Sequence, residues 1–324
     1  MQTNILLSII IPAYNVEKYI SLTLKMLIEQ GLEDCEVIVI DDGSQDNTLD
    51  IATKIANKNT YIKIIHQNNM GVSVARNIGI HNSKGRYIYF MDSDDTLMLG
   101  TLSFYKEILK KQPGHNMYGF GYKCIYPNKK ETYYLYPDFD NKTITNILLA
   151  QNFLSKKFCA NICSCIYERD FLINNKIEFT KGLAIGEDIE FLLKTFVSAK
   201  DMVYYSRIGF VYMIREDSAM EGYKVFSEKH WRSYQIRRDL CLSDKYQTAE
   251  LKKFSNFFIK NEYLSHLIRY LKSSCLSKDI SQKFIEDKKY LYKSSAQGAS
   301  KNSIAILIAK LLPIKLILKI KKGV

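Results

Sequence analysis

Residues 85–95 read GRYIYFMDSDD. The first part alternates aromatic and β-branched side chains, which predicts a buried strand, and three carboxylates follow it within four positions: Asp92, Asp94 and Asp95. Carboxylates this close raise each other's pKa unless a divalent cation or strong hydrogen-bond donors lie among them. The segment therefore predicts either a metal site at the end of a strand or, because Asp and Ser are common turn formers, a solvated turn.

The residues before this segment alternate between short apolar runs and amphipathic helical patterns. The predicted strands and the helices that follow them are 8–11 and 15–31, 36–40 and 48–58, and 61–65 and 72–81. Strands that alternate with helices of about ten residues indicate a parallel α/β sheet with right-handed crossovers. A further amphipathic helix is expected over 96–111, hairpins over 113–140, a strand over 160–167 and a helix from Gly186.

Polar segments follow three of the predicted strands. They are Pro12 to Asn15, Asp41 to Ser44, and Asp92 to Asp95. Ligands of parallel α/β sheets bind beyond the carboxyl ends of the strands, so these segments are expected to form one site. The two acids and the glycine after the second strand suit hydrogen-bond donors of a base or a ribose, or they form a tight turn.

Charge is distributed unevenly along the 324 residues, whose net charge is +12. Residues 1–220 contain 24 Lys or Arg and 25 Asp or Glu, whereas residues 221–324 contain 22 and 9. The basic character therefore belongs to the last third, where no recognisable nucleic-acid reader module is present. The apolar content of 47% supplies the core of one large domain and a smaller one.

The cysteines and the apolar runs indicate the compartment. Seven cysteines form an odd, scattered set, which favours a reducing, cytoplasmic setting. The apolar run 5–11 has no basic flank and is short for a signal peptide, so it is expected to be the first strand. No uncharged apolar stretch reaches the roughly 20 residues that span a bilayer, so any membrane contact should be peripheral.

Cys159, Cys163 and Cys165 lie close together in the sequence and suggest a zinc site. They form no CxxC pair, and no fourth ligand with finger-like spacing follows. Buried structural thiols are the favoured interpretation.

Four segments in fixed order resemble the nucleotide-sugar half of family 2 glycosyltransferases, which have the GT-A fold. They are SIIIPAYN (8–15), VIDDGS (39–44) with Asp46 and Thr48, NMGVSVARN (69–77) and MDSDD (91–95). Gly186-Glu187-Asp188 extends the resemblance to about residue 220. The implied fold class is α/β of the GT-A type: a Rossmann-like, mostly parallel central sheet flanked by helices, with a C-terminal helical extension.

The resemblance divides the chain into three parts. Residues 1–100 would bind the nucleotide-sugar, residues 101–220 would bind the acceptor, and residues 221–324 would form a basic helical region that contacts a membrane surface or a partner. Residues 304–322 interleave Ile and Leu with lysines. This pattern suits an interfacial helix on anionic lipid, with a helix packed on the domain as the alternative.

By position, the resemblance implies roles in donor binding. The nucleobase and ribose pocket would be lined by Pro12, Tyr14, Asn15 and Asp42. Arg76 would face the nucleotide, where a guanidinium pairs with a diphosphate; its alternative is a surface position.

The carboxylates of residues 92–95 correspond to the family's DXD motif. Asp92 would lie near the ribose and share a Mn2+ or Mg2+ ion with Asp94, the principal ligand. Asp95 would orient the acceptor or the metal's water shell. Arg215 resembles a basic segment that approaches the diphosphate from the far side, and its alternative is a surface loop.

The family is inverting and needs a general base, for which Asp188 is the candidate. A carboxylate at the start of a helix can accept the proton of an acceptor hydroxyl. Glu187 would modulate the base or contact the acceptor. In the alternative interpretation both acids only stabilise the N-terminus of a helix electrostatically.

These expectations give one functional hypothesis and two alternatives. The hypothesis is a metal-dependent, inverting glycosyltransferase that moves a sugar from a UDP-sugar to a glycan acceptor in surface polysaccharide or lipid-linked oligosaccharide synthesis. It would work as a peripheral protein at the inner face of the cell membrane. The alternatives are a nucleotidyltransferase, whose basic triphosphate loop is missing after the first strand, and a non-catalytic nucleotide-binding scaffold in a membrane-associated assembly.

Overall fold

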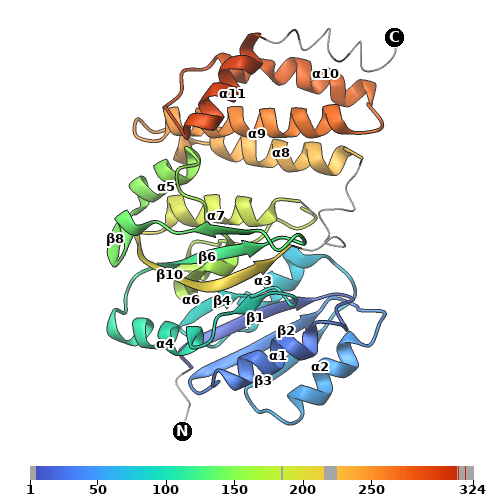
Figure 1. Ribbon diagram of the computed structural model, residues 1–324, viewed down its shortest axis with the longest axis vertical. Coiled ribbons are helices and arrows are strands. Elements are labelled where there is room, and N and C mark those ends of the chain that lie inside the picture. Colours follow the sequence, from blue (N-terminus) through green and yellow to red (C-terminus); the bar gives the residue numbers. More distant parts are fainter. Residues whose placement is uncertain (1–4, 184, 215–224, 312, 314–317, 319–324) are drawn as a thin grey trace. The chain divides into compact units, whose positions relative to one another are not determined.

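The computed structural model describes residues 5–183, 185–214, 225–311, 313 and 318 (Figure 1). The chain forms two compact units. The first, the sheet unit, comprises Met1–Asn146 and Ala160–Arg215, and the second, the helical unit, comprises Ile147–Cys159 and Glu216–Val324. The assignment of separate donor and acceptor halves within the sheet unit stays a prediction.

The sheet unit is built on a ten-stranded sheet. Its strand order is β3-β2-β1-β4-β9-β6-β10-β5, with β7 beside β6 and β8 beside β10. The strands are β1 Leu7–Ala13, β2 Cys35–Asp41, β3 Ile62–His66, β4 Tyr87–Phe90, β5 Thr96–Leu97, β6 Met117–Ile125, β7 Glu131–Tyr134, β8 Lys142–Thr145, β9 Cys165–Glu168 and β10 Asp201–Met213. The first four in space, β3-β2-β1-β4, pair in parallel, and β6 also pairs in parallel with β10, whereas β5, β7, β8 and β9 pair antiparallel.

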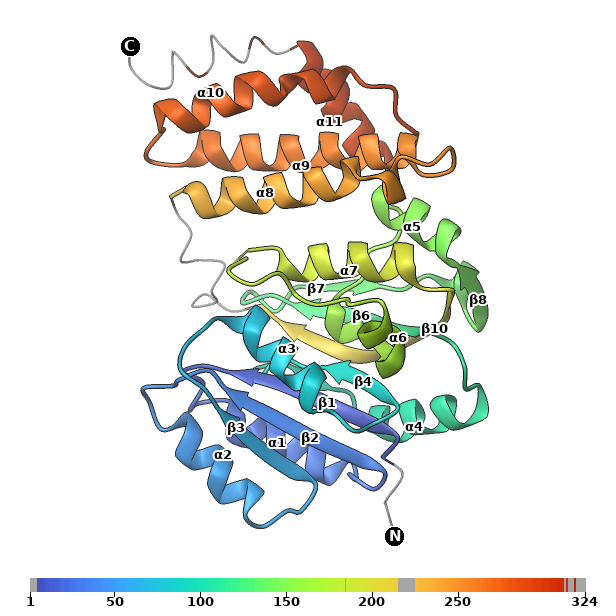
Figure 2. The same cartoon turned by 180° about the vertical axis from the view of Figure 1, so that it is seen from behind.

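The sheet confirms the predicted α/β fold. Every residue of β1 is buried, which explains why this strand is an apolar run without alternation. Helices α1 and α2 lie on one face of the parallel strands and α3 lies on the other (Figures 1 and 2). The α-helices of this unit are α1 Ile20–Glu29, α2 Thr48–Ala56, α3 Val72–Asn82, α4 Thr101–Lys111, α6 Arg169–Asn174 and α7 Glu187–Ser198.

Helix α3 packs closely against β1. A Cβ atom added at Gly79 would lie 2.3 Å from Ile10 Cγ2, so only glycine permits this approach. The close packing fixes the position of α3, which carries Arg76 toward the carboxyl ends of the strands.

Three expected elements begin later than predicted. The helix expected over 15–31 begins at Ile20, because Asn15 has a positive φ of 51 and Tyr19 is the N-cap residue. The helix expected over 96–111 begins at Thr101, because Thr96 and Leu97 form the short strand β5 beside β10. The strand expected over 160–167 begins at Cys165, because Ile162–Ser164 form a 3-10 turn, η2. The Asn161 side chain caps this turn by accepting a hydrogen bond from the Cys163 amide. The hairpin expected within 113–140 is confirmed by the antiparallel pair β6 and β7.

The helical unit has an aromatic core. Its α-helices are α5 Asn146–Leu154, which begins at the unit boundary, α8 Glu228–Leu242, α9 Lys252–Lys272, α10 Lys278–Asp287 and α11 Ser300–Leu311. Trp231, Tyr263, Tyr270 and Phe284 are among the buried residues that pack together. Within the described ranges, no helix is long and apolar enough to cross a membrane.

Candidate active site

The loops that follow β1 and β2 are joined by hydrogen bonds. The Asn15 amide donates to Ser44 Oγ over 3.1 Å, and the Gln45 amide donates to Asn15 Oδ1 over 2.8 Å. Tyr14 is exposed beside them, whereas Pro12 is buried within β1. The two polar segments predicted from the sequence therefore do lie together.

Asp42 holds the loop 67–71 that precedes α3. Its Oδ1 accepts from the Met70 amide at 2.8 Å and from Gln67 Nε2 at 2.6 Å, and its Oδ2 accepts from the Gly71 amide at 2.9 Å. The neighbouring Gly43 has φ +74, and a Cβ atom there would lie 2.7 Å from the Asn69 amide nitrogen. Both oxygens of the buried Asp42 carboxylate thus bind this loop, so Asp42 acts on the pocket through the shape of the loop.

Arg76 is buried and bridges two carboxylates from distant parts of the sequence. Its Nη2 donates to Asp92 Oδ1 over 2.8 Å, and its Nη1 donates to Glu187 Oε1 over 3.1 Å. The Phe179 ring lies 5.2 Å from the guanidinium carbon. Burial disfavours the charge, but the charges of Asp92 and Glu187 outweigh it and raise the pKa of Arg76. Arg76 is therefore a fixed cation at the site rather than a surface arginine.

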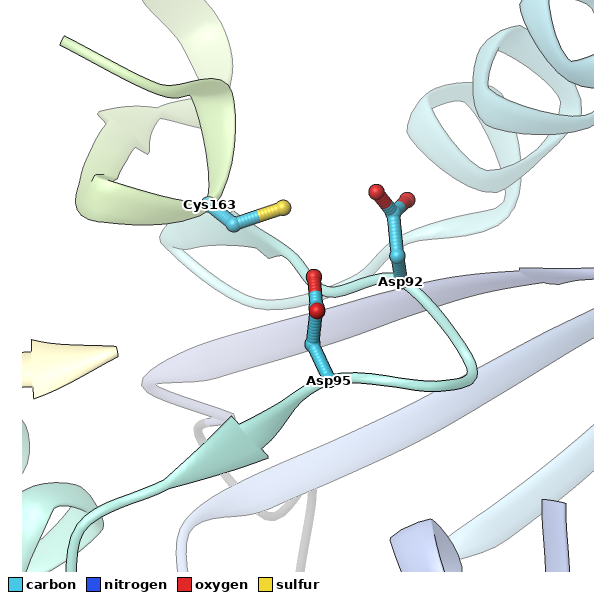
Figure 3. A group of neighbouring side chains, drawn as sticks. All are labelled: Asp92, Asp95 and Cys163. Carbon is cyan, nitrogen blue, oxygen red and sulfur yellow. The ribbon is translucent and has the colours of Figure 1, made fainter. Parts of the chain in front are cut away.

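Asp92, Asp95 and Cys163 point toward one another (Figure 3). One ligand atom from each lies within 4.8 Å of the other two. The Asp95 side chain is buried, its Oδ1 accepts from the Met213 amide at 3.1 Å, and its Oδ2 has no hydrogen-bond partner among the described residues. A buried, unpartnered carboxylate oxygen is costly, so this position fits a cation or a strong donor.

Burial and nearby carboxylates raise the pKa values of two members of this cluster, Asp95 and Cys163. Burial, followed by the charge of Asp92, raises the pKa of Asp95 well above its usual value. Burial and the same two carboxylates raise the pKa of the Cys163 thiol. The thiol is thus kept neutral, which agrees with its interpretation as a buried structural cysteine, although the sequence did not reveal its place beside the carboxylates.

Asp94 is half-buried and is not a member of this group. Together with Asp95 and side chains of α1 that include Lys25 and Glu29, it lines a pocket of about 360 Å³. The turn itself is held by Thr23, whose hydroxyl donates to the Ser93 carbonyl over 2.7 Å. The structure thus brings Asp92 and Asp95 together with Cys163, and it places Asp94 outside that group.

Glu187 and Asp188 are the first two residues of α7, after Gly186 in the left-handed conformation. Burial raises the pKa of Glu187, with Arg76 opposing the shift and Asp188 adding to it. Asp188 is half-buried, and its Oδ1 accepts from the Ile189 amide at 2.8 Å. Glu187 is therefore committed to Arg76, whereas Asp188 is reachable from solvent.

Tyr212, at the end of β10, is affected by the charges of Asp188 and of the strand-end carboxylates. Burial, followed by the charges of Asp95, Asp92 and Asp188, raises the pKa of Tyr212 to about 12. All three carboxylates thus act on one phenol at the end of β10. The sequence indicated Tyr212 as a site residue only through its place in the segment before Arg215. Arg215 itself lies outside the described residues.

The chain is similar in sequence and in fold to known glycosyltransferases. The sequence is 27% identical over 288 residues to the uncharacterized glycosyltransferase EpsJ of Bacillus subtilis, with 86% of this chain and 82% of EpsJ covered. The fold matches TarS 1-349 of S. aureus in complex with UDP-GlcNAc at a TM-score of 0.71 and 21% identity, covering 98% of this chain and 91% of that one. It also matches the mannosyltransferase PcManGT of Pyrobaculum calidifontis in complex with GDP-Man and Mn2+, at a TM-score of 0.57 and 14% identity, covering 94% and 86%.

The family model described as "Glycosyl transferase family 2" matches residues 8–173, which include the strand-end loops, Arg76, the carboxylates of residues 92–95 and Cys163. This match covers more than half of the chain, and the fold is the one that the resemblance implied. The chain therefore belongs to glycosyl transferase family 2 and is a glycosyltransferase.

Proposed function

We propose that this glycosyltransferase transfers a sugar from a UDP-sugar to a glycan acceptor with inversion at the anomeric carbon, and that Asp188 is its general base. The observation that supports the proposal is the Arg76 bridge, since one buried guanidinium binds both Asp92 of the strand-end turn and Glu187, the neighbour of Asp188. Asp92 of the turn and Glu187, the neighbour of the proposed base, thus share one buried guanidinium.

The nucleotide is proposed to bind on the loops after β1 and β2 and on loop 67–71. The exposed Tyr14 ring offers a surface for the base, and Pro12 and Asn15 set the direction of the loop. Asp42 would contribute by holding the Met70 and Gly71 amides. UDP is the proposed nucleotide because TarS, which shares the fold, was solved with UDP-GlcNAc.

A divalent cation fits the turn after β4. Family 2 glycosyltransferases generally use such a metal, and carboxylate oxygens are the ligands that Mn2+ and Mg2+ prefer. Asp94 and Asp92 are proposed to hold it, as the family resemblance implies. Asp95, which lies beside Asp92 and accepts a hydrogen bond from the Met213 amide through Oδ1, is the other candidate ligand. When bound, the cation would neutralise charge on the diphosphate of the leaving nucleotide.

The proposed reaction is a displacement at the anomeric carbon. The acceptor oxygen forms a bond to this carbon, the bond from the carbon to the diphosphate oxygen breaks, and the electron pair leaves with the nucleoside diphosphate. Asp188 takes the proton of the acceptor hydroxyl, and the half-buried position of its carboxylate leaves it accessible to that hydroxyl. Arg76 holds Glu187 and Asp92 in place during this step. Arg215 is proposed to approach the diphosphate from the far side.

The acceptor is proposed to be a lipid-linked or surface-polysaccharide glycan at the inner face of the cell membrane, on the strength of the basic C-terminal third of the chain. The assignment to a glycosyltransferase family replaces the nucleotidyltransferase alternative.

The variant Asp188→Asn tests the base. Transfer should fall by a factor of about 100 to 10,000, while UDP-sugar binding measured calorimetrically stays within about twofold. The matched control is Asp170→Asn on α6, which removes a carboxylate from the first turn of another helix and should leave transfer unchanged. Retained turnover in Asp188→Asn would refute the assignment and favour a different base.

A panel of nucleotide-sugars tests the donor and the metal. The unfolding temperature should rise with a UDP-sugar more than with a GDP-sugar, and Mn2+ should increase the rise. Asp94→Asn should abolish the increment due to Mn2+, whereas Asp95→Asn should preserve it. The reverse result would assign the metal to Asp95.

A further inference from the structure

Helix α11 presents an apolar stripe at the surface of the helical unit. The opposite face of the helix packs into the core of this unit through Ile306 and Ala309. Four aliphatic side chains spaced three or four residues apart share the outer face, with 55–81% of each exposed: Ile304, Leu307, Ile308 and Leu311. Large exposed aliphatic residues that gather on one helix face mark an interaction surface rather than ordinary solvent exposure.

Tyr292 adjoins this stripe. It lies in the 3-10 helix η4, Lys288–Tyr292, and its ring is 59% exposed. Its hydroxyl donates to the Lys310 carbonyl over 3.3 Å, near the end of α11, and Lys288 Nζ lies 5.9 Å from its ring centroid. An amphipathic tyrosine ring between aliphatic side chains and lysines is typical of the boundary between lipid and water.

The described segment that contains Tyr292 and the stripe is basic. Residues 288–311 contain five lysines and no aspartate or glutamate. Lys260, buried on α9, donates to Ser295 Oγ over 2.8 Å, and burial together with the charge of Lys310 lowers its pKa to about 8. An anionic surface beside Lys310 would offset this repulsion.

We propose that the stripe of α11, with Tyr292 and the neighbouring lysines, lies in the headgroup region of an anionic lipid bilayer. Aliphatic side chains would bury in the boundary between headgroups and acyl chains, and each lysine near the surface would attract anionic lipid. A second copy of the chain is a poorer occupant, because a symmetric contact through this stripe brings lysines against lysines. The inference rests on the proposed function only in that a lipid-linked acceptor explains why such a surface would be useful.

Vesicle flotation tests the proposal with the full chain and with no donor or acceptor present. The protein should float with vesicles of phosphatidylcholine that contain about 30% phosphatidylglycerol, and at least about tenfold less with phosphatidylcholine alone. About 0.5 M NaCl should weaken the binding. The double variant Leu307→Ser/Ile308→Ser should reduce binding to the anionic vesicles at least about tenfold, because it removes the centre of the stripe.

The matched control is Leu148→Ser on α5, a half-exposed leucine on another helix of the same unit. It should bind vesicles as the unaltered protein does. The fluorescence of Trp231, the single tryptophan of the chain, reports whether each variant retains the core of the helical unit. Absence of vesicle binding, or equal binding by a folded Leu307→Ser/Ile308→Ser variant, would overturn the proposal, as would a dimer that this variant abolishes. None of these results bears on Asp188, whose role is measured with donor and acceptor in solution.

Discussion

Arg76 donates from Nη1 to Glu187 Oε1 over 3.1 Å, although 111 positions separate the two residues in the sequence. The same guanidinium donates from Nη2 to Asp92 Oδ1 over 2.8 Å. Helix α3 therefore connects the turn after β4 with the start of α7, and it does so through a buried charge. Removing the cation would leave two partly buried carboxylates, Asp92 and Glu187, without their shared partner, which is more costly than losing a surface ion pair.

Arg76→Ala should destabilise the sheet unit by about 3–5 kcal/mol and reduce sugar transfer more strongly than donor binding. Arg76→Lys keeps the charge but not the two-pronged geometry, so its stability should lie between those of Arg76→Ala and the unaltered protein. Circular dichroism during denaturant unfolding measures the stability.

The matched control is Arg86→Ala, because Arg86 is exposed and its guanidinium lies 5.3 Å from the Tyr87 ring. Its stability should change by about 0.5 kcal/mol or less. If Arg76→Ala were as stable as this control, the bridge would contribute nothing to the fold.

Asp42→Ala should weaken UDP-sugar binding at least about tenfold. The change leaves the Met70 and Gly71 amides without their acceptor, and each buried unpaired donor costs about 1–3 kcal/mol, so loop 67–71 should lose its shape. Calorimetric titration with a UDP-sugar measures the affinity. Asp50→Ala, which removes an exposed carboxylate from the first turn of α2, is the control and should bind the donor normally. Unaltered affinity in Asp42→Ala would show that the loop does not shape the donor pocket.

The parallel half of the sheet follows from local sequence. Strands β1, β2 and β4 are buried almost completely, so each is a short apolar run that ends at polar residues, and the helices between them show helical periodicity. Strands β6 and β10 also pair in parallel, but they lie some eighty residues apart in the chain. Nothing in either segment specifies that partner.

The candidate site also contains residues whose positions were predictable from the sequence and residues whose positions were not. The segments around Asn15, Asp42 and Asp92 were predictable because parallel strands bring their carboxyl ends to one edge of the sheet. The place of Cys163 was not predictable, because a 3-10 turn capped by Asn161 directs the thiol toward Asp92 and Asp95 from a segment with strand-like composition. The partners of Arg76 were not predictable either, because long-range packing brings Asp92 and Glu187 to it.

Gly79→Ala should destabilise the sheet unit by about 1–2 kcal/mol, although alanine favours an isolated helix by about 1 kcal/mol over glycine. The added Cβ would lie 2.3 Å from Ile10 Cγ2, so α3 must move away from β1. Denaturant unfolding of Gly79→Ala, Ile10→Ala and the double variant measures the coupling between the two positions. The double variant should be more stable than the sum of the single changes predicts, because alanine at 10 removes the clash. Strict additivity would contradict the close packing.

The stability of the helical unit should fall as the pH decreases from 6.5 toward 4.5. Burial lowers the pKa of His266 to about 4, and its Nε2 lies 3.4 Å from Arg237 Nη2, so protonation would place two cations together. Because the folded-state pKa lies below the unfolded value of 6.5, the unfolded chain binds more protons between these two pH values. The stability due to neutral His266 is therefore complete above pH 6.5 and is lost progressively below it.

Between pH 6.5 and pH 4.5 this loss should be about 2 kcal/mol, because the unfolded histidine goes from half to almost fully protonated over these two pH units while the folded one stays mostly neutral. Urea unfolding monitored by Trp231 fluorescence follows the helical unit alone, since the single tryptophan lies in its core. His266→Gln should remove most of the decrease between pH 6.5 and 4.5, while His81→Gln, at an exposed histidine that pairs with Glu178, should keep it. A decrease of the same size in His266→Gln would assign the pH dependence to other groups.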